Sequence, residues 1–358
     1  MSDTLQSLPH AIGGVHEACF GVPDIDAAVA YWQAFGFRAG KREQLSAAQA
    51  KRLYGVDSPL VSLRLSHQAT DHGLVRLMRW ERPLGAGIGV APLRAHGSRW
   101  VGQFTRNMLD ISNHARVALK QGQPLLEIAP SFIDLSAYNP ALFGGKPPRP
   151  FTDQVIAVRE YTLIQPLWRQ AFLQRFNYDS ALLGSIDDEA MLPASQIVNA
   201  SFMIASDEPG VFDFYRDVLG LKAAGVQEVP WEQAMASRAV FDLREGECHW
   251  CHTFEEPRSG ASNDTRRSGR LYLFRFPSSS ALPDRQTVSQ PGHLGCTLYT
   301  WRVRDVEAMR QACLAAGCNC GEVLADEFDV QAFRCVTPDG MTWVFQQASS
   351  AEIAGMSV

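Results

Sequence analysis

The stretch of the chain with the clearest chemical potential is Cys-His-Trp-Cys-His, residues 248–252. Thiolates and imidazoles are ligands that zinc prefers, and two of each stand here within five residues. A zinc site normally takes a second pair of ligands from another segment, however, and a strand points alternate residues to opposite faces. Only Cys248, Trp250 and His252 can then share a face. Ordinary packing is therefore favoured over a metal site, and His252 stands as a group able to exchange protons near neutral pH.

A second pair of thiols, Cys318 and Cys320, stands in a Cys-Asn-Cys sequence after the end of a predicted helix. This pair also lacks an obvious partner pair, so we expect these thiols to pack in the core or to face solvent. The eight cysteines are scattered through the chain, which is typical of free thiols in a reducing compartment.

Composition narrows the class of protein. The chain has 358 residues, 46% of them hydrophobic and 20% charged, with a net charge of −5. These values predict a globular protein and provide no basic stripe for nucleic acid. No signal peptide, membrane-spanning run, P-loop, dinucleotide fingerprint or nucleophile elbow is found. We therefore expect a cytoplasmic protein, monomeric or homo-oligomeric, whose partner is a small-molecule substrate and neither nucleic acid nor membrane.

The elements that must position chemical groups repeat along the chain. Residues 14–40 combine an alternating strand with an amphipathic helix that contains Tyr-Trp, and residues 197–225 do the same with Phe-Tyr. Residues 293–323 form another strand and helix, and residues 101–125 form a weaker copy. The chain is therefore predicted to contain four related units.

The helices of the first and third units resemble the recurring helix motif of the vicinal oxygen chelate superfamily, which contains glyoxalases, bleomycin-resistance proteins and extradiol dioxygenases. The segments that carry the resemblance are "DIDAAVAYWQAFGF" and "VFDFYRDVLGL". The resemblance implies an α+β fold in which four βαβββ units pair into two curved-sheet barrel domains. We expect an N-terminal glyoxalase-like barrel at 14–165, a helical or irregular linker at 166–196 and a C-terminal glyoxalase-like barrel at 197–347.

The resemblance also implies a divalent metal, Fe, Mn, Ni or Zn, held by His or Glu on the first and last strands of paired units. Glu17 is the one well-placed ligand of this type. The other ligand positions are predicted to fall on Arg76, Gln103, Ala200, Leu298 and Val344. An arginine opposes cation binding, and the lack of His or Glu at the other positions also disfavours a metal. The cofactor is therefore unknown.

If no metal is bound, the inward polar groups become the candidate site. Glu17 and Arg76 are predicted to be catalytic as a general base and an oxyanion stabiliser, and His252 is the acid–base candidate of the other barrel. A structural ion pair between Glu17 and Arg76 is the alternative. The predicted substrate-binding residues are Gln103, Asn107, Met78, Trp250 and Thr300.

Two functions remain open at this level. The first is an enzyme of the lyase, isomerase or ring-oxygenase class that acts on a small apolar metabolite, aromatic or carbonyl-bearing. The second is a metal-free protein that binds and sequesters small molecules, as bleomycin-resistance proteins do. A third interpretation makes one barrel a scaffold for the other, and the missing ligands favour the second barrel as the scaffold.

Overall fold

The computed structural model describes residues 11–68, 70–138, 146–178, 181–205, 210–259, 267–277 and 280–354. Its elements form four consecutive βαβββ units, which confirms the predicted α+β class. Unit one contains β1 (Ala11–Gly21), α1 (Ile25–Gln33), β2 (Arg38–Leu45), α2 (Ala47–Tyr54), β3 (Leu60–Ser66) and β4 (Leu74–Trp80). Unit two contains β5 (Arg99–Thr105), α3 (Met108–Lys120), β6 (Leu126–Asp134), α4 (Leu135–Tyr138), β7 (Ala157–Ile164) and β8 (Arg169–Phe176).

The second half of the chain repeats this order. Unit three contains β9 (Ala194–Met203), α6 (Gly210–Asp213) with the π-helical turn η2 (Phe214–Val218), β10 (Lys222–Pro230), α7 (Met235–Val240), β11 (Cys248–Glu255) and β12 (Arg270–Arg275). Unit four contains β13 (Gly295–Val303), α8 (Val306–Ala315), β14 (Asn319–Cys320), β15 (Leu324–Ala325), β16 (Gln331–Val336) and β17 (Thr342–Gln347), followed by α9 (Ser350–Ala354). None of the described helices is long and apolar enough to cross a membrane.

The helices begin where the sequence provides caps. The Asp24 carboxylate accepts hydrogen bonds from the backbone N–H groups of Asp26 and Ala27, and α1 buries Ile25, Ala28 and Trp32 on one face. Asp305 caps α8 in the same way, through the N–H of Ala308. Aspartate followed by apolar residues at three- and four-residue spacing therefore produces helices α1 and α8.

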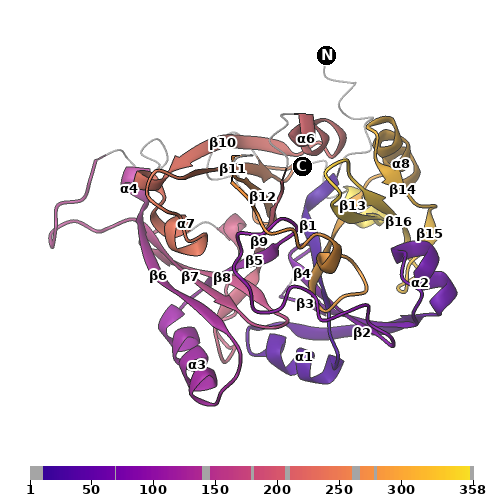
Figure 1. Ribbon diagram of the computed structural model, residues 1–358, viewed down its shortest axis with the longest axis horizontal. Helices are drawn as coiled ribbons and strands as arrows, with labels where there is room; N and C mark the ends of the chain where they lie inside the picture. Colours follow the sequence, from indigo (N-terminus) through magenta and orange to yellow (C-terminus); the bar gives the residue numbers. More distant parts are fainter. Residues whose placement is uncertain are drawn as a thin grey trace.

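The strands form two sheets, and each sheet takes strands from both halves of the chain. One sheet has the order β14-β16-β17-β13-β1-β4-β3-β2, so it joins unit four to unit one. The other has the order β10-β11-β12-β9-β5-β8-β7-β6, so it joins unit three to unit two. Figure 1 shows the indigo N-terminal strands beside the yellow C-terminal ones. The predicted division into barrels at 14–165 and 197–347 therefore differs from the observed sheets.

The pairing rests on the first strand of each unit. β1 hydrogen-bonds antiparallel to β13, and β5 does so to β9. Because the unit's own strands cover the other edge of β1, only a strand from a different unit can complete it. Sequential order alone does not reveal which unit provides that strand.

The predicted linker at 166–196 was wrong over its first half. Residues Arg169–Phe176 form β8, which lies between β5 and β7 in the sheet. The segment contains arginines and glutamines. These polar residues hide the pattern of a strand whose side chains are buried on both faces.

The two sheets pack against each other through their convex faces. Phe202 on β9 contacts Trp343 on β17, with ring centroids 5.5 Å apart. The hydroxyl of the buried Tyr299 on β13 donates to the carbonyl oxygens of Trp100 and Ser201 on the other sheet, at 2.9 Å each. The two concave faces point away from this contact and from each other. They are therefore the surfaces on which a functional site can lie.

One close approach joins the sheets at Gly14 of β1. A Cβ atom added to Gly14 would lie 2.5 Å from the Cα of Gly269, and the Val15 N–H donates to the Gly269 carbonyl at 3.0 Å. We expect Gly14→Ala to lower the free energy of unfolding by about 1–3 kcal/mol through overpacking. Denaturant unfolding measures this change. Gly210→Ala is the control, because a Cβ there meets nothing within 4 Å, and equal stability of the two variants would contradict the prediction.

Candidate functional site

The concave face of the first sheet holds a buried charge network centred on Glu17. The Glu17 carboxylate accepts from Arg76 Nη2 at 2.5 Å, from Thr300 Oγ1 at 3.0 Å and from Arg64 Nε. Glu17, Arg76 and Thr300 are each fully buried. The structure therefore brings together three residues that the sequence proposed for a site, although β1 and β13 come from opposite ends of the chain.

The segment 326–327 completes this network from the other side. Arg76 Nη1 donates to Glu327 Oε1 at 3.1 Å and to the Tyr54 hydroxyl at 2.9 Å, and Arg76 Nη2 lies 3.7 Å from Asp326 Oδ2. The Arg76 guanidinium thus lies between three carboxylates. Burial alone would raise the pKa of Glu17, but Arg64 and Arg76 hold it well below its ordinary value.

Packed side chains fill the rest of this concave face. Helix α2 places Leu53 and Tyr54 against Met78 and Trp80, and all four are buried. Leu298 and Val344, two of the predicted ligand positions, belong to the same cluster. Met78, predicted to contact substrate, is therefore a core residue under α2.

A divalent ion does not fit the ligand positions on this face. Both oxygens of Glu17 accept from arginines, and the neighbouring positions hold Thr300, Leu298 and Val344. A guanidinium here provides the positive charge that an ion would bring, and a second cation beside it would be repelled. The donor set therefore supports no catalytic step through a metal in this half-barrel.

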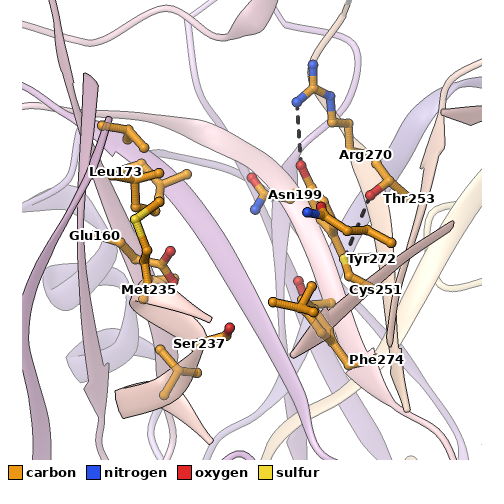
Figure 2. A pocket seen from close by; sticks show the side chains of 18 of the residues that line it. Glu160, Leu173, Asn199, Met235, Ser237, Cys251, Thr253, Arg270, Tyr272 and Phe274 are labelled. Carbon is orange, nitrogen blue, oxygen red and sulfur yellow. Dashed lines mark hydrogen bonds between the residues drawn. The ribbon is translucent and has the colours of Figure 1, made fainter. Parts of the chain in front are cut away.

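The concave face of the second sheet contains a cavity of about 490 Å³. Helix α7 covers part of it, and six of its lining residues are Trp100, Phe104, Glu160, Asn199, Cys251 and Tyr272. Figure 2 shows Glu160, Leu173 and Met235 on one side and Asn199, Cys251, Tyr272 and Phe274 on the other. This volume lies in the range of sites for small organic molecules.

Glu160 on β7 is a carboxyl group of this cavity that has no counter-charge among the residues that the structure describes. Among the described residues no side chain forms a hydrogen bond or ion pair with it, and desolvation raises its pKa to about 7. The partial exposure of Glu160 is toward the cavity that it lines. A carboxyl group of this kind holds or releases a proton at neutral pH, as general acids and bases do.

The thiol of Cys251 lies across the cavity on β11. Its Sγ is 3.8 Å from Thr253 Oγ1. Burial, opposed in part by this hydrogen bond and reinforced by the charge of Glu160, raises the pKa of Cys251 to about 12. Cys251 is therefore a neutral thiol in this site and does not supply a thiolate.

Polar groups at the same wall can orient a ligand. Arg270 Nη1 donates to the Tyr272 hydroxyl at 3.4 Å, and Arg270 Nη2 lies 3.3 Å from Glu255 Oε1. The side chain of Asn199 lies over Gly102, where an added Cβ would be 2.6 Å from Asn199 Nδ2. Its amide has no hydrogen-bond partner within the described part of the chain, so it is free to bind a polar group of a ligand.

The two residues predicted from Cys-His-Trp-Cys-His lie on the opposite face of β11. His252 stacks on Phe212 with ring centroids 3.5 Å apart, and Arg275 lies over the Trp250 ring at 4.2 Å. Burial, reinforced by Arg275, lowers the pKa of His252 to about 4. The face of β11 that lines the cavity instead carries Cys251 and Thr253, because successive residues of a strand point to opposite faces.

Gln103 and Asn107 are likewise occupied by the protein itself. Gln103 donates to the Ser195 carbonyl and accepts from Gln170, both at 2.9 Å. Asn107 is the N-cap of α3 and accepts from the Leu109 N–H at 3.1 Å. On β5 and β9 the cavity is lined by residues next to the predicted positions, Phe104 next to Gln103 and Asn199 next to Ala200. A shift of one residue accounts for both errors, because it exchanges the faces of a strand.

Comparison with known families finds a similarity for the C-terminal part of the chain. Residues 199–345 match the Glyoxalase/Bleomycin resistance protein/Dioxygenase superfamily. Residues 199–345 thus resemble this superfamily, and the two-sheet architecture of the whole chain has the fold of a solved glyoxalase I. Comparison with curated protein sequences finds no match.

Among solved structures, glyoxalase I from Zea mays has a TM-score of 0.52 at 13% identity, with 96% of this chain and 94% of that chain covered. A single-residue mutant of that enzyme has a TM-score of 0.50 at 15% identity, with coverage of 97% and 95%. A protein from Bacillus subtilis named as a candidate dioxygenase has a TM-score of 0.50 at 11% identity, with coverage of 94% and 86%. At these identities the likeness shows the fold alone.

The buried network makes a prediction about stability. Glu17→Gln removes the charge that balances Arg64 and Arg76, so we expect unfolding free energy to fall by about 3 kcal/mol at neutral pH. Because the pKa of Glu17 is depressed in the folded state, the loss should diminish as the pH falls below the ordinary glutamate value. Denaturant unfolding at several pH values measures both effects.

Glu43→Gln is the matched control, because Glu43 pairs with Lys41 at the surface and should contribute about 0–1 kcal/mol. A Glu17→Gln protein as stable as this control would show that the network does not hold the first half-barrel together.

Proposed function

We propose that the chain binds a small, largely apolar molecule, aromatic or carbonyl-bearing, in the cavity of the second half-barrel and catalyses proton transfer on it. The observation that carries this proposal is Glu160, a carboxyl group inside a cavity of about 490 Å³ with no counter-charge in the described part of the chain. The reaction class is isomerase or lyase, in which a carbon–hydrogen bond next to a carbonyl is broken by a general base.

Glu160 acts as the base in this proposal. Its ionised form removes a proton from the ligand, and its neutral form returns the proton to another carbon or to a leaving group. A pKa of about 7 places both forms within reach at neutral pH, which is the condition for one group to serve in both steps. The apolar rings of Trp100 and Phe104 bind the ligand and exclude water from the carboxyl group.

The opposite wall orients the ligand and stabilises developing charge. The Asn199 amide and the Tyr272 hydroxyl donate to the carbonyl oxygen, and Arg270 supplies positive charge behind Tyr272. The Cys251 thiol is neutral at this wall, so it adds no negative charge to oppose an enolate. Charge that forms on the ligand oxygen is therefore met by fixed donors.

The rival function is sequestration without turnover. Its support is the charge network of the first half-barrel, which occupies the positions where the superfamily resemblance leads one to expect a metal. Aromatic walls and an adaptable polar rim are sufficient for binding alone.

Deuterium exchange separates the two functions. Aromatic ketones, aldehydes and phenols are screened for binding by thermal shift, and bound compounds are incubated with the protein in D₂O. We expect deuterium to enter the carbon next to the carbonyl, or a converted product to form. Glu160→Gln should retain binding while exchange falls by at least about 100-fold, the usual contribution of a general base.

Ala171→Phe fills the cavity from β8 and tests whether the ligand binds there. We expect it to abolish the rise in melting temperature that the ligand causes. A ligand that binds tightly and is recovered unchanged and undeuterated would select sequestration. Exchange that survives Glu160→Gln would remove Glu160 from the mechanism.

Glu160 also predicts how stability depends on pH. The folded state binds the Glu160 proton more tightly than the unfolded chain, so its ionisation reduces stability as the pH rises from about 4.5 through about 7. We therefore expect Glu160→Gln to raise the melting temperature at pH 8 and to have little effect near pH 4.5. Calorimetry at the two pH values measures the difference, and an equal shift at both would contradict the raised pKa.

A further inference from the structure

Four cysteines from unit four converge at one edge of the first sheet. Cys313 lies in the last turn of α8, Cys320 on β14 and Cys335 directly opposite Cys320 on β16. The Sγ atoms of these three lie within 4.8 Å of one another. Cys318 lies in the intervening turn, where its N–H donates to the Cys313 carbonyl at 3.0 Å. Figure 1 shows α8, β14 and β16 together at this edge.

We infer that Cys313, Cys320 and Cys335, with Cys318 available for the fourth position, bind a Zn²⁺ ion. The site lies on the other sheet from the cavity and does not depend on the proposed reaction.

The geometry is close to that of a zinc–thiolate centre. Zn–S bonds of about 2.3 Å in a tetrahedron place the sulfur atoms roughly 3.8 Å apart, so binding requires the thiols to approach by no more than about 1 Å. Three ligands come from three separate elements, each held by its own backbone hydrogen bonds. Thiolate ligands of this softness favour zinc over magnesium or calcium.

The surroundings suit a charged centre with a route of entry. Cys313 and Cys335 are fully buried, whereas Cys320 is partly exposed and gives access from solvent. Arg310, one turn before Cys313 on α8, donates from Nε to the carbonyl of Gly321 at 2.8 Å. Its guanidinium offsets part of the negative charge that three or four thiolates leave after binding Zn²⁺.

The ion would hold together a part of the fold that has few hydrogen bonds. β14 has two residues, and in its antiparallel pairing with β16 Asn319 lies opposite Val336 and Cys320 opposite Cys335. A metal bond from Cys313 to this pair would tie α8 to the sheet edge. Binding to the folded state alone stabilises a protein in proportion to the logarithm of metal concentration over Kd.

Cobalt titration of the reduced full-length chain tests the inference. We expect one equivalent of Co²⁺ to give a sulfur-to-cobalt charge-transfer band and the intense visible bands of tetrahedral coordination. One equivalent of Zn²⁺ should displace it, and Zn²⁺ should raise the melting temperature. Absence of the charge-transfer band in the folded, reduced protein would overturn the inference.

Two Cys→Ser variants show which cysteines bind the metal. Cys320→Ser alters the partly exposed ligand and should weaken Co²⁺ binding by at least about tenfold, since even groups outside the coordination sphere bring changes of 10–100-fold. Cys248→Ser is the matched control, because Cys248 is also a partly exposed strand thiol but belongs to Cys-His-Trp-Cys-His. We expect it to bind like wild type.

Loss of the cobalt bands in Cys248→Ser with retention in Cys320→Ser would place the metal at 248–252 and overturn the inference. A Cys320–Cys335 disulfide found by mass spectrometry, with no metal uptake after reduction, would overturn it in favour of a redox pair. Circular dichroism of each variant confirms that lost binding is not lost folding.

Discussion

The structure depends on covering the open edge of the first strand in each βαβββ unit. Within unit one the strand order places β1 at the end, beside β4, so its other row of backbone N–H and C=O groups needs a partner. An unpaired row inside the protein would cost free energy at every group. The antiparallel pairing of β1 with β13, and of β5 with β9, meets this requirement and interlocks the two halves of the chain.

This pairing brings the central strands of two units together on each concave face. The side chains on these strands determine whether the face is filled or contains a cavity. In the first half-barrel the central positions hold Glu17, Arg76 and Thr300, and the guanidinium of Arg76 provides the positive charge between the carboxylates. Arg64, Asp326 and Glu327 complete a network that is largely buried. Removing one member would leave the others charged and buried, which explains why the network acts as a unit.

In the second half-barrel the corresponding surface is left open. Small or uncharged residues such as Gly102 and Ala171 stand on the central strands, and Asn199 occupies the space over Gly102. The helices inserted after the second strand of units one and three also differ. Helix α2 packs its Tyr54 into the first concave face, whereas α7 borders the cavity of the second. The concave face of the first half-barrel is therefore filled by its own side chains, whereas that of the second contains a cavity.

The sequence by itself determined the local elements and their repetition. Capping aspartates and apolar periodicity predicted the helices, and the repeated phrase predicted four βαβββ units of the superfamily, because these signals lie within one short segment each. It also placed Glu17 beside Arg76 correctly, since both lie on strands of one unit. It missed Glu160, whose one local signal is a lone carboxylate in the strand 157–164.

Only the tertiary structure decided which units share a sheet, which face of each strand is inward and which distant side chains meet. A shift of one residue separates the predicted Ala200 from Asn199, and likewise the predicted His252 from Cys251, which line the cavity. The convergence of Cys313, Cys320 and Cys335 is of the same kind. Strand partners and faces are set by burial and hydrogen bonding summed over the whole sheet, and residues far apart in the chain contribute equally to that sum.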